Sequence, residues 1–183
     1  MSFPALFDTN VLYGALLNDF ILELADRGLY RPLWSEDILD ELRKNLVKAG
    51  EGAALVDKRI STMRTYFPDA MVDGHNSLIP TMTCDSKDRH VLAAAVRGGA
   101  EVLVTFNIKD FPDESTAPFD VEVVHPDDFL LDQLDLYHAP TLRALVELVA
   151  AYDSPAMTVD DYLFALTRAG VPKFADAVRT KLY

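Results

Sequence analysis

The stretch FPALFDTNVL, residues 3–12, sets the start of the fold. Its first five residues are apolar and bulky, as in a short buried strand, and its last two begin a run with helical spacing that continues to Leu24. Between these segments stand Asp8, Thr9 and Asn10, although a helix cap needs only one polar side chain. The pattern predicts a strand with an aspartate at its tip, followed by a turn and a helix.

Further along, strands and helices alternate. A second short strand is predicted at 30–34, followed by a helix that Ser35 caps and that runs to about Ala49. Helical spacing resumes over residues 55–67, and Pro68 ends it because proline cannot continue a helix.

Three more segments complete the pattern. The segment CDSKDRHVLAAAVRGG, residues 84–99, predicts a helix that Asp85 caps and that ends at the two glycines. Residues 100–106, AEVLVTF, have the apolar composition of a parallel strand covered on both faces, and another strand is predicted at 121–124. Residues 72–82 are ambiguous. Strands that alternate with helices predict an α/β fold with a central parallel sheet flanked by helices.

The composition changes after residue 126, where no β-branched run remains and helical patterns fill the chain. The sequence TVDD from Thr158 is typical of a capping box. We therefore predict an α/β domain at 1–126 and an all-helical extension at 127–183. The apolar stripes of the extension either complete the core or form a surface for a partner. They lie at 130–136, 142–149 and 162–166.

Bulk composition excludes several classes of protein. Of the 183 residues, 50% are hydrophobic and 25% charged, which is the balance of a soluble globular protein. Cys84 is the single cysteine, so the chain has no intrachain disulfide and no zinc cage built from thiols. No signal peptide is visible, and the longest apolar run is too short for a membrane span. We expect a cytoplasmic protein without membrane contact.

Charge is unevenly distributed. The net charge of −12 argues against passive adhesion to nucleic acid. Residues 43–64 nevertheless form a basic island, with only Glu51 and Asp57 as acids. Its basic residues are Arg43, Lys44, Lys48, Lys58, Arg59 and Arg64. The island is either a solvated helical face or a surface that holds a polyanion.

Five polar residues stand where a ligand site is expected. Ligands of parallel α/β sheets gather outside the carboxyl ends of the strands, where Asp8, Asn107 and Asp110 fall. Asp88 lies in the first turn of its helix, and Glu41 lies on a flank of its helix, off the apolar stripe. Converging carboxylates repel unless protons or cations compensate them. Oxygen ligands without a Cys or His cluster favour Mg²⁺ or Mn²⁺, which typically act on phosphates.

Each acid also has a purely structural interpretation. Asp8 with the two polar residues after it can form an Asx-type cap, and Glu41 can pair with Lys44 on the surface. Asp88 can be the third residue of a capping box, and Asp110 an ordinary turn acid. The four histidines are scattered without ligand spacing and are assigned no chemistry.

Four segments resemble the motifs of the PIN domain family, and within it the VapC-type toxins. They are FDTNVLYGAL, SEDILDELRKNL, DSKDRHVLAAAV and EVLVTFNIKDF, in the order and approximate spacing of the family. Together they cover roughly residues 3–125, and the helical extension is similar to the C-terminal region of one VapC subgroup. The resemblance implies a Rossmann-like fold and a ribonuclease that depends on Mg²⁺ or Mn²⁺. It also implies a homodimer, RNA as the substrate and a VapB-type antitoxin as a partner.

The family's site residues carry over with one departure. The resemblance assigns catalytic roles to Asp8, Glu41 and Asp88, of which the two aspartates bind metal. Many members have an aspartate two residues after the strand threonine, which is Thr105 here, but this chain has Asn107 and, three residues later, Asp110. Either of these two completes the metal site, and Asp110 is the fourth predicted catalytic residue. Thr105, Thr9 and Asn10 then support the site.

The hypothesis that follows is hydrolysis of RNA phosphodiester bonds. In it, Glu41 orients or deprotonates the attacking water. The RNA backbone is held by Lys44, Lys48 and Arg59. The main alternative is a PIN module that Asn107 has weakened and that binds RNA or protein. An aspartyl-phosphate phosphatase is disfavoured because Asn10 stands where its second aspartate belongs, and the order of acids does not fit a receiver domain.

Overall fold

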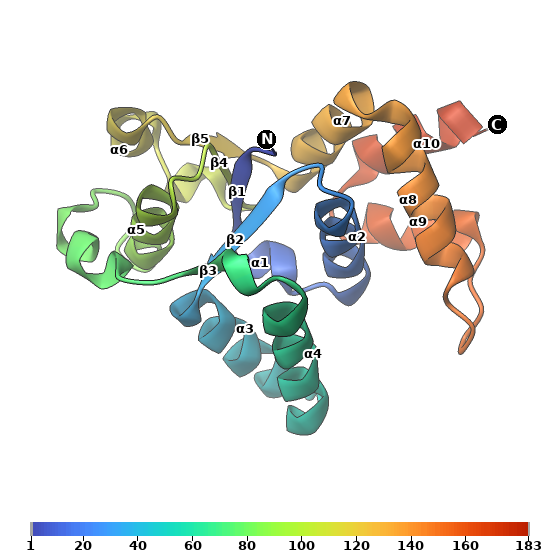
Figure 1. The fold of residues 1–183 in the computed structure, drawn as a ribbon, viewed down its shortest axis with the longest axis horizontal. Helices are drawn as coiled ribbons and strands as arrows, with labels where there is room; N and C mark the ends of the chain where they lie inside the picture. Colours follow the sequence, from blue (N-terminus) through green and yellow to red (C-terminus); the bar gives the residue numbers. More distant parts are fainter. Residues whose placement is uncertain (1, 183) are drawn as a thin grey trace.

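The computed structural model describes residues 2–182 and shows a five-stranded parallel sheet flanked by helices (Figure 1). The strands are β1 Pro4–Phe7, β2 Arg31–Ser35, β3 Met71–Val72, β4 Val102–Val104 and β5 Glu122–Val124. Their order across the sheet is β3-β2-β1-β4-β5, and every pair is parallel. The predicted parallel α/β fold is confirmed.

Strand β1 is the centre of the sheet and of the core. Ala5 lies opposite Pro32 of β2 and Val102 of β4, and residues Ala5 to Phe7 are fully buried. The chain runs from β1 outward to β2 and β3 and then returns to β4 on the other side of β1. The strand order therefore reverses between β1 and β4, which is where a parallel α/β sheet opens a crevice for a ligand.

Helices cover both faces of this sheet. The helices before β5 are α1 Thr9–Leu12, α2 Ala15–Asp26, α3 Glu36–Lys48, α4 Ala53–Tyr66, α5 Arg89–Gly98 and α6 Asp113–Thr116. Short 3₁₀ helices are η1 Pro68–Ala70, η2 His75–Thr81, η3 Ile108–Asp110 and η4 Ala117–Phe119. Helix α5 lies on one side of the sheet and α2 on the other, while α3 and α4 pack together at one end (Figure 1).

Several caps follow the predicted chemistry, but two helix starts differ. Ser35 caps α3 by accepting the amide N–H of Ile38. The single helix predicted after β1 is divided at Gly14, which has an extended backbone between α1 and α2. The prediction that Asp85 caps α5 is wrong. Asp85 instead accepts the Lys87 amide N–H in the preceding turn, and α5 begins only after Asp88.

Beyond β5 the chain is helical, as predicted. The helices are α7 Pro126–Leu136, α8 His138–Ala150, α9 Val159–Arg168 and α10 Pro172–Leu182, the last of which the sequence pattern did not separate. The predicted capping box at Thr158 is present, since its hydroxyl accepts the Asp161 amide N–H and the Asp161 carboxylate accepts the Thr158 amide N–H. No helix within residues 2–182 is long and apolar enough to cross a membrane.

The C-terminal helices share the core of the sheet. Phe129 of α7 packs edge-on against Phe7 and Tyr30, with ring centroids 5.5 Å and 5.0 Å away. Tyr162 of α9 donates its hydroxyl to the backbone carbonyl of Leu16 in α2 at 2.5 Å. The helical region therefore lies alongside α2 (Figure 1), and its buried stripes complete the core.

Candidate active site

A crevice of about 410 Å³ opens at the carboxyl ends of β1 and β4. Its walls come from the turn after β1, from α3, from the start of α5 and from the loop after β4. The lining residues are Asp8, Thr9, Asn10, Tyr13, Glu41, Asn45, Asp88 and Asn107. Three of the four predicted carboxylates thus share one crevice, although they lie far apart in the sequence.

Asp8 is buried and held by three neighbours. One carboxylate oxygen accepts the amide N–H of Thr9 at 2.7 Å. The other accepts the Thr105 hydroxyl at 2.7 Å and the Asn10 side-chain amide at 2.8 Å. Burial raises the pKa of Asp8, and the hydrogen bonds from Thr105 and Thr9 oppose the rise because they favour the charged form. The cap interpretation and the site interpretation are therefore compatible, since one side chain makes both sets of contacts.

The two residues after Asp8 reach other walls of the crevice. The hydroxyl of Thr9 donates to the Glu41 carboxylate at 3.2 Å and lies 3.3 Å from the Ile38 carbonyl oxygen. The side-chain oxygen of Asn10 accepts the amide N–H of Phe106 at 3.1 Å. The turn after β1 therefore fixes the helix that carries Glu41 and the loop that follows β4.

Glu41 has a histidine beside it that the sequence did not identify as part of the site. The Nε2 atom of His90 lies 3.6 Å from a Glu41 carboxylate oxygen. Spacing gave no signal for this pair, because the partners lie on α3 and α5. Asn45 also lines the crevice, as its position one turn after Glu41 allows. Tyr13 also lines the crevice, and the sequence did not identify it as part of the site.

Asp88 shows most directly that the acids converge. The pKa of Asp88 is raised to about 6, first by burial and then by the charges of Asp8, Asp110, Asp85 and Glu41, in that order. A carboxyl group loses its proton less readily when other negative charges surround it. Since Asp88 does not cap its helix with its side chain, its carboxyl group is left for the crevice.

The structure distinguishes Asn107 from Asp110 by position. Asn107 lines the crevice, whereas Asp110 is not among the lining residues. Asp110 is nevertheless near enough for its charge to act on Asp88. The short helix η3 begins after Asn107, and the Asp110 amide N–H donates to the Asn107 carbonyl oxygen at 3.0 Å.

The donor set suits a hard divalent cation that keeps part of its hydration shell. Within residues 2–182, no three His, Cys, Asp or Glu side chains gather tightly enough to enclose a metal ion. Mg²⁺ does not need such a cage, because it usually binds one or two carboxylates and retains several waters. Asp8 and Asp88 supply two carboxylates with excess negative charge between them. These residues therefore fit Mg²⁺ by donor chemistry.

Much of the basic island is neutralised internally. Arg43 pairs with Asp57, and Arg64 pairs with Glu36. The guanidinium of Arg59 donates to the carbonyl oxygens of Leu12 and Tyr13 at the end of α1, so its donors serve the backbone. Lys44 and Lys48 on α3 are exposed, and neither is in an ion pair in the described part of the chain.

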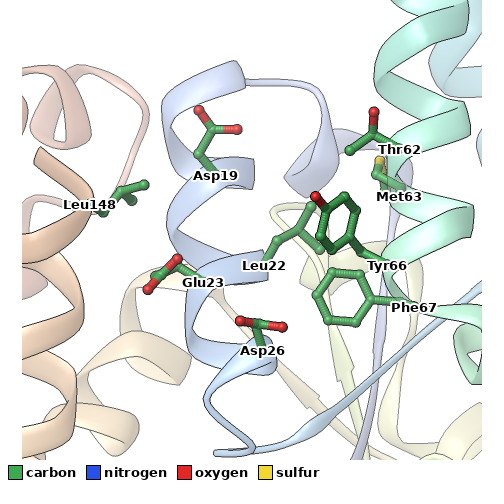
Figure 2. A pocket seen from close by; sticks show the side chains of 9 residues that line it. All are labelled: Asp19, Leu22, Glu23, Asp26, Thr62, Met63, Tyr66, Phe67 and Leu148. Carbon is green, nitrogen blue, oxygen red and sulfur yellow. The ribbon is translucent and has the colours of Figure 1, made fainter. Parts of the chain in front are cut away.

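A second hollow of about 250 Å³ lies over α2, between α4 and Leu148 of α8 (Figure 2). Its apolar part consists of Leu22, Met63, Tyr66, Phe67 and Leu148. Two of its three acids, Asp19 and Glu23, have structural partners. Asp19 accepts the Tyr152 hydroxyl, and Glu23 pairs with Arg27. The hollow holds none of the predicted catalytic residues.

Comparisons with known proteins agree with this architecture. Residues 4–109 match the family model described as PIN domain, and residues 126–180 match the one described as VapC50 C-terminal domain. The chain belongs to the PIN domain family. It is 47% identical over 123 residues to a protein of Mycobacterium tuberculosis (strain H37Rv) named "Putative ribonuclease VapC50", a match that covers 65% of this chain and 72% of that protein. No solved structure matches the chain significantly. The predicted relationship to VapC-type proteins is confirmed.

Proposed function

We propose that this protein is an endoribonuclease that depends on a divalent metal ion, Mg²⁺ or Mn²⁺. The observation that carries the proposal is the crevice in which Asp8, Glu41 and Asp88 meet beside Asn107. The repulsion between Asp88 and the acids around it supports a bound cation, because only positive charge or protons relieve it. The similarity to a protein named as a ribonuclease supports RNA as the substrate.

In this proposal Asp8 and Asp88 hold the ion, and Asn107 or Asp110 completes its protein ligands. When bound, such an ion supplies a water of lowered pKa and stabilises the charge that develops on the phosphate. Asp8 is suited to this role because its three hydrogen bonds fix the carboxylate before any ion arrives. A preorganised ligand loses little freedom on binding.

Glu41 is the proposed general base. It accepts the proton of the attacking water as the water oxygen bonds to phosphorus and the bond from phosphorus to the leaving oxygen breaks. The hydroxyl of Thr9 at 3.2 Å and the imidazole of His90 at 3.6 Å restrict the carboxylate of Glu41. Lys44 and Lys48 lie on the same helix as Glu41 and hold the RNA backbone by charge.

Cleavage of RNA by the purified protein tests the proposal. We expect cleavage with Mn²⁺ or Mg²⁺, loss of cleavage with a chelator, and no cleavage by Asp8→Asn, whose fold is checked by circular dichroism. Asp135→Asn is the matched control, because it removes a carboxylate from an exposed position on α7, away from the crevice lining. An Asp8→Asn protein that cuts RNA at the wild-type rate would remove Asp8 from the mechanism.

One observation favours a second candidate, a PIN module with weakened activity that binds RNA or protein. Asn107 lines the crevice where many family members are expected to have an aspartate, so the site has one charge fewer. Calorimetry with Mn²⁺ separates the two candidates. An active site binds Mn²⁺, and a chelator blocks its cleavage of RNA, whereas a weakened site binds Mn²⁺ poorly.

We further infer that the protein acts as the toxin of a toxin–antitoxin pair and is restrained by a VapB-type antitoxin. The match to the VapC50 C-terminal domain and the identity to the VapC50 relative support this role. Expression that is toxic for the wild type and harmless for Asp8→Asn is the expected result. The homodimer and the cytoplasmic location stay predictions, which light scattering and cell fractionation test.

A further inference from the structure

Phe106 connects the crevice with the C-terminal helices. It lies between Thr105, which donates to Asp8, and Asn107, which lines the crevice. Its ring packs edge-on against the imidazole of His125, with centroids 5.1 Å apart. On another side, the backbone of Gly170 approaches so closely that an added Cβ atom would lie 2.8 Å from the ring. We call this pair of contacts, from His125 and Gly170, the Phe106 clamp.

The backbone around Phe106 is held from the crevice side. The amide N–H of Phe106 donates to the Asn10 side-chain oxygen at 3.1 Å, and the amide N–H of Asn107 donates to the Thr105 hydroxyl oxygen at 3.1 Å. Asn10 and Thr105 both bond to the Asp8 carboxylate. A shift of the Phe106 ring therefore strains hydrogen bonds that lead directly to Asp8 and Asn107.

One buried residue, Asp127, connects both parts of the clamp through its backbone amide and its carboxylate. Asp127 is 2% exposed, and its amide N–H donates to Nδ1 of His125 at 3.1 Å. Its carboxylate accepts the amide N–H groups of Lys173 and Phe174, at 3.0 Å and 2.8 Å, in the first turn of α10 just after Gly170. His125 and Gly170 are thus held relative to each other within the C-terminal region.

We propose that the C-terminal helical region positions Asn107 at the crevice through the Phe106 clamp. Close packing transmits a displacement at Gly170 to the ring and then to the loop after β4, because a packed interior has little free space to absorb it. Any effect of this positioning on metal binding and catalysis rests on the proposed function, whereas the positioning of the loop itself does not.

The chain contains a matched control for a test at Gly170. Gly170 and Gly50 each follow an alanine that ends a helix, and each has φ of +97°. An alanine at either position adopts the same unfavourable backbone conformation. Nothing lies within 4 Å of a Cβ atom added at Gly50, whereas at Gly170 the Phe106 ring is in the way. The difference between Gly170→Ala and Gly50→Ala therefore isolates the contact with Phe106.

Two measurements on the full-length protein test the proposal. We expect Gly170→Ala to speed hydrogen exchange at the Phe106 and Asn107 amides relative to Gly50→Ala, because local opening of the loop becomes easier. We also expect the Kd for Mn²⁺ to rise by about tenfold, the lower end of the effect of losing a group that orients a metal ligand. Equal exchange at these amides in the two variants would overturn the proposal.

A second variant keeps the test decisive if Gly170→Ala does not fold. Phe106→Leu shortens the side chain, so the same two amides should exchange faster, and unchanged exchange refutes the clamp. In the Phe106→Leu background, adding Gly170→Ala should lower the free energy of unfolding no more than adding Gly50→Ala does, since the clashing ring is gone. If the exchange results hold but the wild type neither binds Mn²⁺ nor cuts RNA, the proposed function fails and the clamp stands.

Discussion

Replacing Asp88 by asparagine should stabilise the metal-free protein at neutral pH. Burial and the surrounding acids raise the pKa of Asp88 from 3.8 to about 6. At about 1.4 kcal/mol per pKa unit, the shift corresponds to about 3 kcal/mol. Because Asp88 is partly exposed, solvent screening reduces this to about 1–2 kcal/mol. An asparagine side chain has a similar shape and no charge, so the folded variant would no longer bear this repulsion.

The sign of the pH dependence follows from the direction of the shift. The pKa of Asp88 is higher in the folded than in the unfolded protein, so the folded state binds its proton more tightly. The stability that the neutral carboxyl group provides is complete below pH 3.8 and is lost as the pH rises through about 6. The advantage of Asp88→Asn should therefore be largest above pH 6 and less than half as large near pH 4.5.

Thermal unfolding followed by circular dichroism measures this effect. In chelator at pH 7.5 we expect the Tm of Asp88→Asn to exceed that of the wild type by about 3–6 °C, given the size of the chain. Mn²⁺ should raise the Tm of the wild type, because it binds the folded state, and should leave Asp88→Asn nearly unchanged. The Asp135→Asn protein controls for loss of an exposed acid. A lower Tm for Asp88→Asn in chelator at pH 7.5 would refute the reasoning.

Four further substitutions have definite expected outcomes. Lys44→Ala and Lys48→Ala should each raise the KM for RNA and reduce the slope of log affinity against log salt by about 0.7, as expected for one lost phosphate contact, and unchanged salt curves would contradict this. Arg59→Ala should lower the free energy of unfolding by about 1–3 kcal/mol in urea denaturation, because carbonyl groups at the end of α1 lose their donor. Gly98→Ala should lower the free energy of unfolding by about 1–3 kcal/mol in the same assay, because the added Cβ atom would lie 2.8 Å from a side-chain carbon of Val72. A stabilised variant would show that α5 has room there.

The parts of the fold that depend on local pattern could be predicted from the sequence. Strands β1 and β4 are marked by apolar residues that end in polar ones, and the Ser35 and Thr158 caps act on amides three residues away. Such signals need no knowledge of the rest of the chain. The same holds for the positions of Asp8 and Asp88, whose places in the fold follow from strand ends and helix starts.

Features that depend on distant contacts could not be predicted. Asp85 and Asp88 have the spacing of a capping box, but the Asp85 amide N–H instead donates to the backbone carbonyl of Asp110, which fixes a turn there. His90 reaches Glu41 only because α5 and α3 meet at the crevice. The break at Gly14 likewise has no signal in the apolar pattern, which continues through it.

Each of the three polar residues after β1 connects to a different part of the crevice. Asp8 receives the Thr105 hydroxyl from the end of β4, Thr9 donates to Glu41 on α3, and Asn10 accepts the Phe106 backbone amide. A single capping residue could satisfy the start of α1, but it could not hold three segments that are separated by up to 97 positions along the chain. The tripeptide therefore brings together residues that the sequence keeps apart, and the arrangement of the crevice depends on the strand that presents it.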